Sequence, residues 1–139
     1  MLSELDKKSI VNAIQSAEEI TSGEIRVHID KKCGKDPFKE ATRVFERLGM
    51  TKTKERNGTL IYLCFKSKQL AILGDQGINE KVPEGFWDEL YHSMVTAFRN
   101  EQYGRGICEA IERIGEKLSA HFPVNADNPN ELSNEITEA

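Results

Sequence analysis

The fold of this chain is decided by residues 60–73, which read LIYLCFKSKQLAIL. Residues 60–65 form an unbroken apolar run, which is typical of a strand that is covered on both faces. Residues 70–73 form a second apolar run, and only a short polar link, residues 66–68, lies between the two. Because so short a link leaves room only for a tight turn, we expect the two strands to form an antiparallel hairpin.

The segments around this hairpin predict helices and one more strand. Residues 24–30 alternate apolar and polar side chains, which indicates a strand covered on one side only. Apolar residues at helical spacing, Phe38 and Trp87 among those expected to be buried, predict helices over residues 3–20, 37–48, 83–100 and 103–122. The resulting order of elements predicts an α/β fold, with a small mixed central sheet flanked by helices.

The same pattern predicts one domain and a tail. Residues 1–123 carry the helices and strands, whereas residues 124–139 contain few large apolar side chains and no lysine or arginine. Such a composition cannot bury enough surface to offset the entropy of ordering the chain. We therefore expect residues 124–139 to be a disordered, polar and acidic tail.

The net charge and the cysteines indicate what the protein does not bind and where in the cell it is expected. The formal net charge of -4 argues against nucleic-acid binding, which needs a basic surface. We expect no secretory signal and no membrane insertion, because no apolar run is long enough. Cys64 and Cys108 fall in apolar patterns and are expected to be buried thiols rather than bridge partners, which favours a cytoplasmic location.

Topology brings three polar loops together. If residues 24–30 and 60–65 share a sheet, the helical crossover between them makes these strands parallel. The starts of both strands and the end of the third then meet at one edge, which gathers Glu24, the pair Arg56 and Asn57, and Asp75. Two helix C-termini, which carry partial negative charge, are expected at the same edge.

This loop cluster has two interpretations from spacing alone. Carboxylate, amide and carbonyl oxygens are ligands for a hard cation such as Ca²⁺ or Mg²⁺, and Asp88 is a further carboxylate if its helix starts near the site. Basic residues beside a cation can hold a phosphate group, as Arg56 and Lys54 would here. The simpler alternative is that the glycines only form turns and that Glu24 and Arg56 are solvated surface charges.

Four stretches resemble the TPM domain family. They read TSGEIRV at residues 21–27, RNG at 56–58, ILGDQGI at 72–78 and YGRGI at 103–107, and the likeness covers residues 5–123. The resemblance implies a Rossmann-like α/β/α sandwich. Relatives in that family are described as acid phosphatases, as proteins that bind calcium or other divalent ions, and as factors in the assembly or modulation of membrane complexes. On this chain, the matching ligand positions are Glu24, Asn57 and Asp75.

Two functions of different class follow. The first is a Ca²⁺-binding or other divalent-cation-binding module with an interaction, assembly or regulatory role, whose partner besides the cation is another protein. The second is a weak metal-dependent acid phosphatase in which Arg56 and Lys54 hold the phosphate. A phosphatase needs a nucleophile or a metal-activated water, and the sequence offers no complete nucleophile–base pair, so the binding module is favoured.

Overall fold

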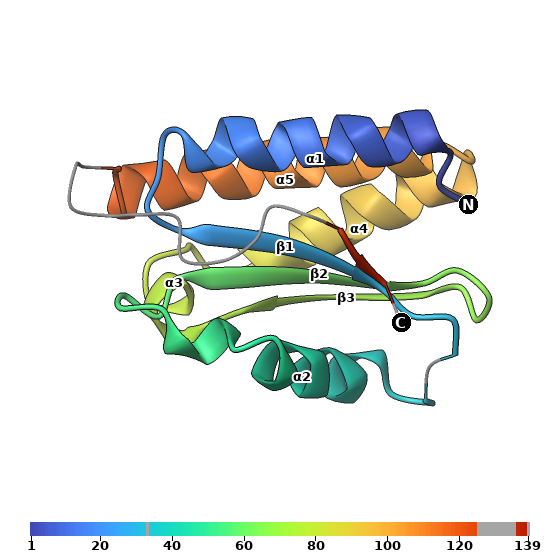
Figure 1. Cartoon of the computed structure of the whole chain (residues 1–139), viewed down its shortest axis with the longest axis horizontal. Helices are drawn as coiled ribbons and strands as arrows, with labels where there is room; N and C mark the ends of the chain where they lie inside the picture. Colours follow the sequence, from blue (N-terminus) through green and yellow to red (C-terminus); the bar gives the residue numbers. More distant parts are fainter. Residues whose placement is uncertain (33, 125–135, 139) are drawn as a thin grey trace.

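The computed structural model describes residues 1–32, 34–124 and 136–138. The strands form one mixed sheet in the order β3-β2-β1-β4 (Figure 1). The elements in chain order are α1 (Glu4–Glu18), β1 (Glu24–Ile29), α2 (Pro37–Arg47), the 3-10 helix η1 (Met50–Lys52), β2 (Gly58–Cys64), β3 (Gln69–Gly74), α3 (Gln76–Asn79), α4 (Phe86–Arg99), α5 (Tyr103–His121) and β4 (Thr137–Glu138).

The predicted strand directions are confirmed. β1 pairs with β2 in parallel, and β2 pairs with β3 in antiparallel fashion. The turn between β2 and β3 is closed by a hydrogen bond from the Lys68 amide to the Phe65 carbonyl oxygen at 3.1 Å. The starts of β1 and β2 and the end of β3 therefore lie at one edge of the sheet, on the left in Figure 1.

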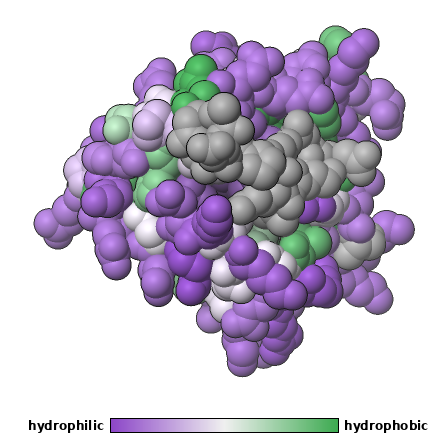
Figure 2. Space-filling view, turned by 60° about the vertical axis from the view of Figure 1, so that its left-hand side comes forward, coloured by the Kyte–Doolittle hydropathy of each residue, from purple (hydrophilic) through white to green (hydrophobic). Residues whose placement is uncertain are grey.

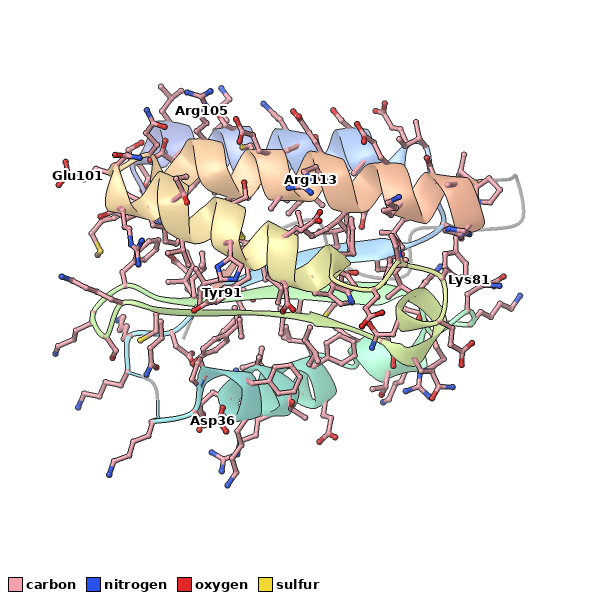
Figure 3. All side chains as sticks on the ribbon, turned by 180° about the vertical axis from the view of Figure 1, so that it is seen from behind. Asp36, Lys81, Tyr91, Glu101, Arg105 and Arg113 are labelled. Atoms are coloured by element: carbon pink, nitrogen blue, oxygen red, sulfur yellow. The ribbon has the colours of Figure 1, made fainter. Side chains whose placement is uncertain are left out.

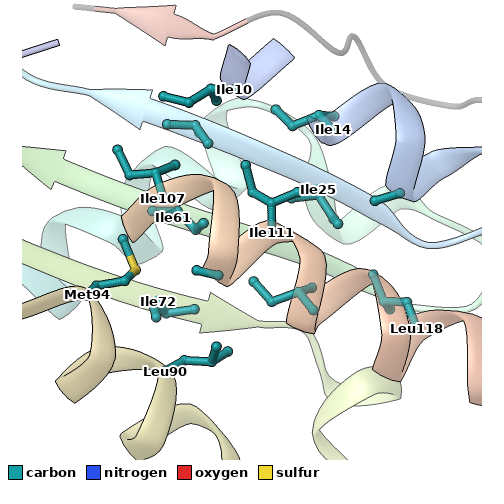
Figure 4. Packing of buried hydrophobic residues seen from close by; sticks show 14 of the residues in the cluster. Ile10, Ile14, Ile25, Ile61, Ile72, Leu90, Met94, Ile107, Ile111 and Leu118 are labelled. Atoms are coloured by element: carbon teal, nitrogen blue, oxygen red, sulfur yellow. The ribbon is translucent and has the colours of Figure 1, made fainter. Parts of the chain in front are cut away.

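Helices cover both faces of the sheet, which makes the α/β/α sandwich that the sequence predicts. α1, α4 and α5 pack on one face against a core that includes Ile25, Ile61 and Ile72 (Figure 4). α2 and η1 pack on the other face, where a smaller cluster includes Leu60 and Tyr62. Each fully buried aliphatic side chain of this kind contributes about 1.5–3 kcal/mol, so burial of these two cores holds the three layers together.

α1 and α2, the helices that precede and follow β1 in the sequence, begin at capping residues. Ser3 caps α1 and forms a capping box with Asp6, in which each side chain accepts a hydrogen bond from the other residue's amide at 3.0 Å. Asp36 caps α2 by accepting hydrogen bonds from the amides of Phe38 and Lys39. These side chains satisfy amides that have no partner inside their own helix, and so fix where α1 and α2 begin.

Four features differ from the sequence prediction. Phe38 is 55% exposed, because it lies at the rim of a groove beside the edge strand β3 instead of under α2. The polar face of β1 is buried, with Glu24 and His28 each 2% exposed. The short helix α3 was not expected. Most of the predicted tail, residues 125–135 and 139, lies outside the described residues, but Thr137 and Glu138 form β4 in parallel with β1.

The cysteines also differ from expectation. Cys64 is disulfide-bonded, so the prediction of a thiol at this position is wrong, whereas Cys108 is a free thiol as expected. Burial raises the pKa of the Cys108 thiol, with nearby acidic residues acting in the same direction. Because a disulfide is uncommon in a reducing compartment, the cysteines no longer support a cytoplasmic location. Among the described helices, none is both long and apolar enough to cross a membrane.

Candidate functional site

The three polar loops meet at the left-hand edge of the sheet, as the topology predicts. Glu24 begins β1 and is in register with Gly58, the first residue of β2. Asp75 follows β3 directly and donates its amide to the Gly58 carbonyl oxygen at 2.9 Å. Gly58 therefore lies between Glu24 and Asp75, and the described residues that are coloured on this side of the molecule are mostly hydrophilic (Figure 2).

Asp75 is the centre of the hydrogen bonds at this edge. Its side chain is 7% exposed and caps α3 by accepting the Gln76 amide at 2.8 Å. It also accepts two hydrogen bonds from Arg56, one from Nε to Oδ2 at 2.6 Å and one from a terminal nitrogen to Oδ1 at 2.8 Å. Both carboxylate oxygens are thus in use, and one side-chain cation offsets the charge of this nearly buried group.

Arg56 reaches Asp75 from an unusual backbone conformation. Its φ of 51° lies in the left-handed region, which is uncommon for a residue with a side chain. The Arg56 carbonyl oxygen accepts a hydrogen bond from the Gly77 amide at 2.8 Å. A Cβ atom on Gly77 would lie 2.1 Å from the Glu55 carbonyl oxygen, so only glycine lets the two loops approach this closely. The hydrogen bond to Asp75 raises the pKa of Arg56 above its ordinary value.

Asn57 joins the first two loops. It is 1% exposed, and its Nδ2 donates to the Ser22 hydroxyl at 3.4 Å. Its amide donates to the Thr53 hydroxyl at 3.3 Å, which closes the turn that precedes β2. Asn57 therefore holds Ser22, and with it the start of β1, against the loop that carries Arg56.

Glu24 and Asp75 lie on opposite sides of Gly58, which belongs to the middle strand β2. Two strand spacings separate these residues, which places their Cα atoms about 10 Å apart. Met50 packs over Gly58 between them, since a Cβ on Gly58 would meet the Met50 carbonyl oxygen at 3.3 Å. Glu24 is thus placed to add negative potential to the cluster, and no contact between Glu24 and Asp75 appears among the described interactions.

Lys54 and Asp88 lie outside this cluster. Lys54 is exposed in the turn before Arg56, and the described residues give it no ion pair. Asp88 is exposed on α4 and lines the groove beside β3 together with Phe38 and Tyr91. The structure therefore brings Arg56, Asn57 and Asp75 together, with Glu24 alongside, and leaves Asp88 on a different surface.

The donor chemistry of the cluster suits a hard divalent cation. Asp75 and Glu24 offer carboxylate oxygens and Asn57 offers an amide oxygen, which Ca²⁺ and Mg²⁺ prefer. No group of three or more histidine, cysteine or acidic side chains suitable for a metal ion occurs among the described residues. The guanidinium of Arg56 stands in the position of a cation beside Asp75, which shows that positive charge is stabilised there. The residues fit a cation on the condition that Arg56 moves away.

A second polar cluster, which the sequence analysis missed, lies at the opposite end of β1. His28 forms hydrogen bonds to Asp30 and to Thr137, each at 2.8 Å, and Asp30 accepts the Tyr62 hydroxyl at 2.5 Å. Burial and then the hydrogen bond to Asp30 raise the pKa of Tyr62. The signal was present in the sequence, because His28 and Asp30 fall on one face of a strand whose parallel partner places Tyr62 beside His28.

Solved structures of similar fold exist, although no curated protein matches the chain. The BA42 protein of the psychrophilic bacterium Bizionia argentinensis is 40% identical with a TM-score of 0.90, covering 100% of this chain and 96% of that one. The N-terminal domain of a P. gingivalis protein is 18% identical with a TM-score of 0.68, and the match covers 87% of this chain and 78% of that one. The N-terminal domain of the Corynebacterium glutamicum cg2496 protein is 17% identical with a TM-score of 0.67, and the match covers 91% of this chain and 79% of that one.

The last two likenesses show the shared fold alone, because their sequence identity is low. The likeness to BA42 extends over the whole chain at a much higher identity. The family model of the TPM domain matches residues 1–117, which include every loop of the candidate site. The chain therefore belongs to the TPM domain family.

Proposed function

We propose that the loop cluster around Asp75 binds a divalent cation, Ca²⁺ before Mg²⁺, and that the chain is a cation-dependent interaction module. The observation that carries this proposal is the state of Asp75, a 7%-exposed carboxylate at the meeting point of three loops. A carboxylate so far removed from water needs a positive partner. Arg56 fills that need in the structure, and a bound cation in its place would fill it too while tying the loops that precede β1 and β2 to the one that follows β3.

In this proposal the residues have different tasks. Asp75 supplies the charged ligand, and Asn57, which already links two loops, supplies an amide oxygen. Glu24 adds negative potential from across Gly58. The preference for Ca²⁺ rests on the loose arrangement of these oxygens, because Mg²⁺ demands near-octahedral geometry at short distances, whereas Ca²⁺ accepts irregular sites. Asp88 remains a predicted ligand, and no hydrogen bond or ion pair of the described residues joins it to the cluster.

A weak phosphomonoesterase is the second candidate, and one observation favours it. Arg56 is 38% exposed and lies beside a carboxylate that would bind a metal, so its guanidinium could reach a phosphate oxygen. However, within the described part of the site no hydroxyl or thiol is paired with a general base, and Ca²⁺ lowers the pKa of bound water less than Zn²⁺ does. We therefore place the binding function first.

Replacement of Asp75 tests the cation site. Asp75→Asn keeps an oxygen that can cap α3 but removes the charge, so Ca²⁺ affinity should fall about tenfold or more while the fold persists. Affinity would be measured by calorimetry and by NMR titration. Asp36→Asn is the matched control, since Asp36 is also a helix cap but pairs with no arginine in the part of the chain that the structure describes. The Ca²⁺ affinity of this variant should stay within about twofold of the original.

The wild-type titration carries the decisive result. Resonances of residues 22–24, 56–58 and 74–77 should shift on addition of Ca²⁺. If they remain unmoved up to millimolar Ca²⁺, the cation proposal is wrong. For the second candidate, hydrolysis of p-nitrophenyl phosphate should be slow and should change by less than about fivefold in Arg56→Ala. Efficient hydrolysis that is lost in both Asp75→Asn and Arg56→Ala, with folding intact, would instead establish the enzyme.

A further inference from the structure

Arg56 occupies both oxygens of the carboxylate that a cation would need. Its Nε and one terminal nitrogen bind Oδ2 and Oδ1 of Asp75 at 2.6 and 2.8 Å. We infer that Arg56 is a built-in competitor of the cation, so that cation binding at Asp75 and release of the Arg56 side chain are a single exchange. This inference rests on the proposed function and adds to it a means of regulation by the chain itself.

The two partners of this ion pair differ in how firmly they are held. Asp75 is fixed through its amide, which donates to Gly58, and through its side chain, which accepts from Gln76. The Arg56 side chain has Asp75 as its partner among the described residues and is 38% exposed. The guanidinium can therefore turn into water while the carboxylate remains in place to receive a cation.

The backbone of Arg56 does not have to move in this exchange. Its carbonyl oxygen is held by the Gly77 amide at 2.8 Å, and its amide donates to the Thr53 carbonyl oxygen at 3.3 Å. The loop thus keeps its shape while the side chain changes rotamer, a motion that exposed side chains complete in picoseconds to nanoseconds. The exchange is local, and the rest of the fold keeps its arrangement.

The charge at Asp75 explains why the two events are coupled. A nearly buried carboxylate with no positive neighbour is costly, so in the absence of another cation the guanidinium stays on Asp75 in most molecules. The closed ion pair also weakens the apparent affinity for the cation, because only molecules with Arg56 turned away can bind it. If the pair is closed in about four of five molecules, the apparent dissociation constant is raised about fivefold over that of the open site.

Calorimetry and NMR on the full chain test this exchange with Ca²⁺ alone as the ligand. In Arg56→Gln the competing charge is gone, so the protein should bind Ca²⁺ about fivefold more tightly or better. Arg105→Gln is the matched control, because Arg105 forms an exposed ion pair with Glu109 on α5. Figure 3 shows Arg105 at the opposite end of the molecule from Lys81, which follows α3. Its loss should leave the affinity within about twofold, as expected for an exposed pair.

A second measurement needs no variant and therefore does not depend on how Arg56→Gln folds. The Nε–H resonance of Arg56 in the wild-type protein reports directly on its hydrogen bond to Asp75. During the Ca²⁺ titration this signal should move to the position of a solvated arginine, in parallel with the amides of residues 74–77.

The outcomes separate this inference from the function on which it rests. If Ca²⁺ shifts the amides at the cluster but the Arg56 Nε–H signal stays in place, or if Arg56→Gln binds Ca²⁺ no better than wild type, the exchange is refuted and the cation site stands. If neither protein binds Ca²⁺ at millimolar concentration, the proposed function itself fails.

Discussion

The close approach of two backbone segments at Gly77 makes a sharp test of how the candidate site is assembled. A Cβ atom at this position would lie 2.1 Å from the Glu55 carbonyl oxygen and 2.6 Å from that of Arg56. Both obstacles are backbone atoms, so Gly77→Ala can be accommodated only if one loop moves. The move breaks the hydrogen bond from the Gly77 amide to Arg56, which is worth about 1 kcal/mol.

Overpacking of the loops adds about 1–3 kcal/mol, so the free energy of unfolding should fall by about 2–4 kcal/mol. For a domain of this size the melting temperature should drop by roughly 6–12 °C, measured by calorimetry or circular dichroism. The sign is informative, because alanine in a helix such as α3 would otherwise be about 1 kcal/mol better than glycine.

Gly34→Ala serves as the control for Gly77→Ala. There a Cβ would meet only the end of the Glu40 side chain, at 2.9 Å, and that side chain can turn aside. The melting temperature of this variant should stay within about 2 °C of the original, since substitutions away from tight contacts cost little. A Gly77→Ala protein as stable as the wild type would show that the loops are not packed as described and would remove the structural basis of the site.

Three further predictions concern the rest of the molecule. Tyr62→Phe should lower the free energy of unfolding by about 1.5–3 kcal/mol near pH 8, because Asp30 loses a hydrogen bond. Since the pKa of Tyr62 is raised in the folded state, the difference in stability between the two proteins should shrink above about pH 10. A difference that does not change with pH would contradict the hydrogen bond between Tyr62 and Asp30. Thr137→Ala should increase amide exchange at β4, because Thr137 forms hydrogen bonds to His28 and Val27 of β1. The Ca²⁺ affinity should not change, since these bonds lie at the end of β1 away from Asp75. Unchanged amide exchange would show that the hydrogen bonds of Thr137 do not hold β4 in place. Inorganic phosphate should bind more tightly in the presence of Ca²⁺ than in its absence, as NMR titration would show, because the released Arg56 becomes available to it; equal affinity would argue against that role.

Most of the architecture could be predicted from local patterns. The apolar runs at residues 60–65 and 70–73 have a short link that allows one kind of connection, and the helix between the first two strands fixes their relative direction. The convergence of Glu24, Asn57 and Asp75 followed from those directions alone. The starts of the first two helices are local features as well, because the caps Ser3 and Asp36 bind amides only two or three residues away.

The remaining features depend on contacts between distant residues or on missing neighbours. Phe38 follows the apolar stripe of its helix, but it lines a groove beside the edge strand β3 and is 55% exposed, and no periodicity reveals where a sheet ends. The parallel pairing of Thr137 with His28 joins residues 109 positions apart and involves only two residues of β4. The ion pair of Arg56 with Asp75 joins two residues of one predicted cluster, but spacing alone does not show whether an arginine or an added cation neutralises the carboxylate.

Arg56 links the two candidate functions in a way that the sequence alone did not show. A guanidinium whose charge is already offset by Asp75 attracts a phosphate group less strongly, so the cation-free protein has only a weakened form of the phosphate-binding residue that a phosphatase of this design requires. Any hydrolytic activity should therefore depend on the cation even if that ion does nothing more than take the place of Arg56. In Arg56→Lys the same dependence should weaken, because a single ammonium group cannot match the two hydrogen bonds of the guanidinium and leaves Asp75 more readily. A cation requirement that is identical in the two proteins would instead mean that the ion acts on the reacting groups themselves.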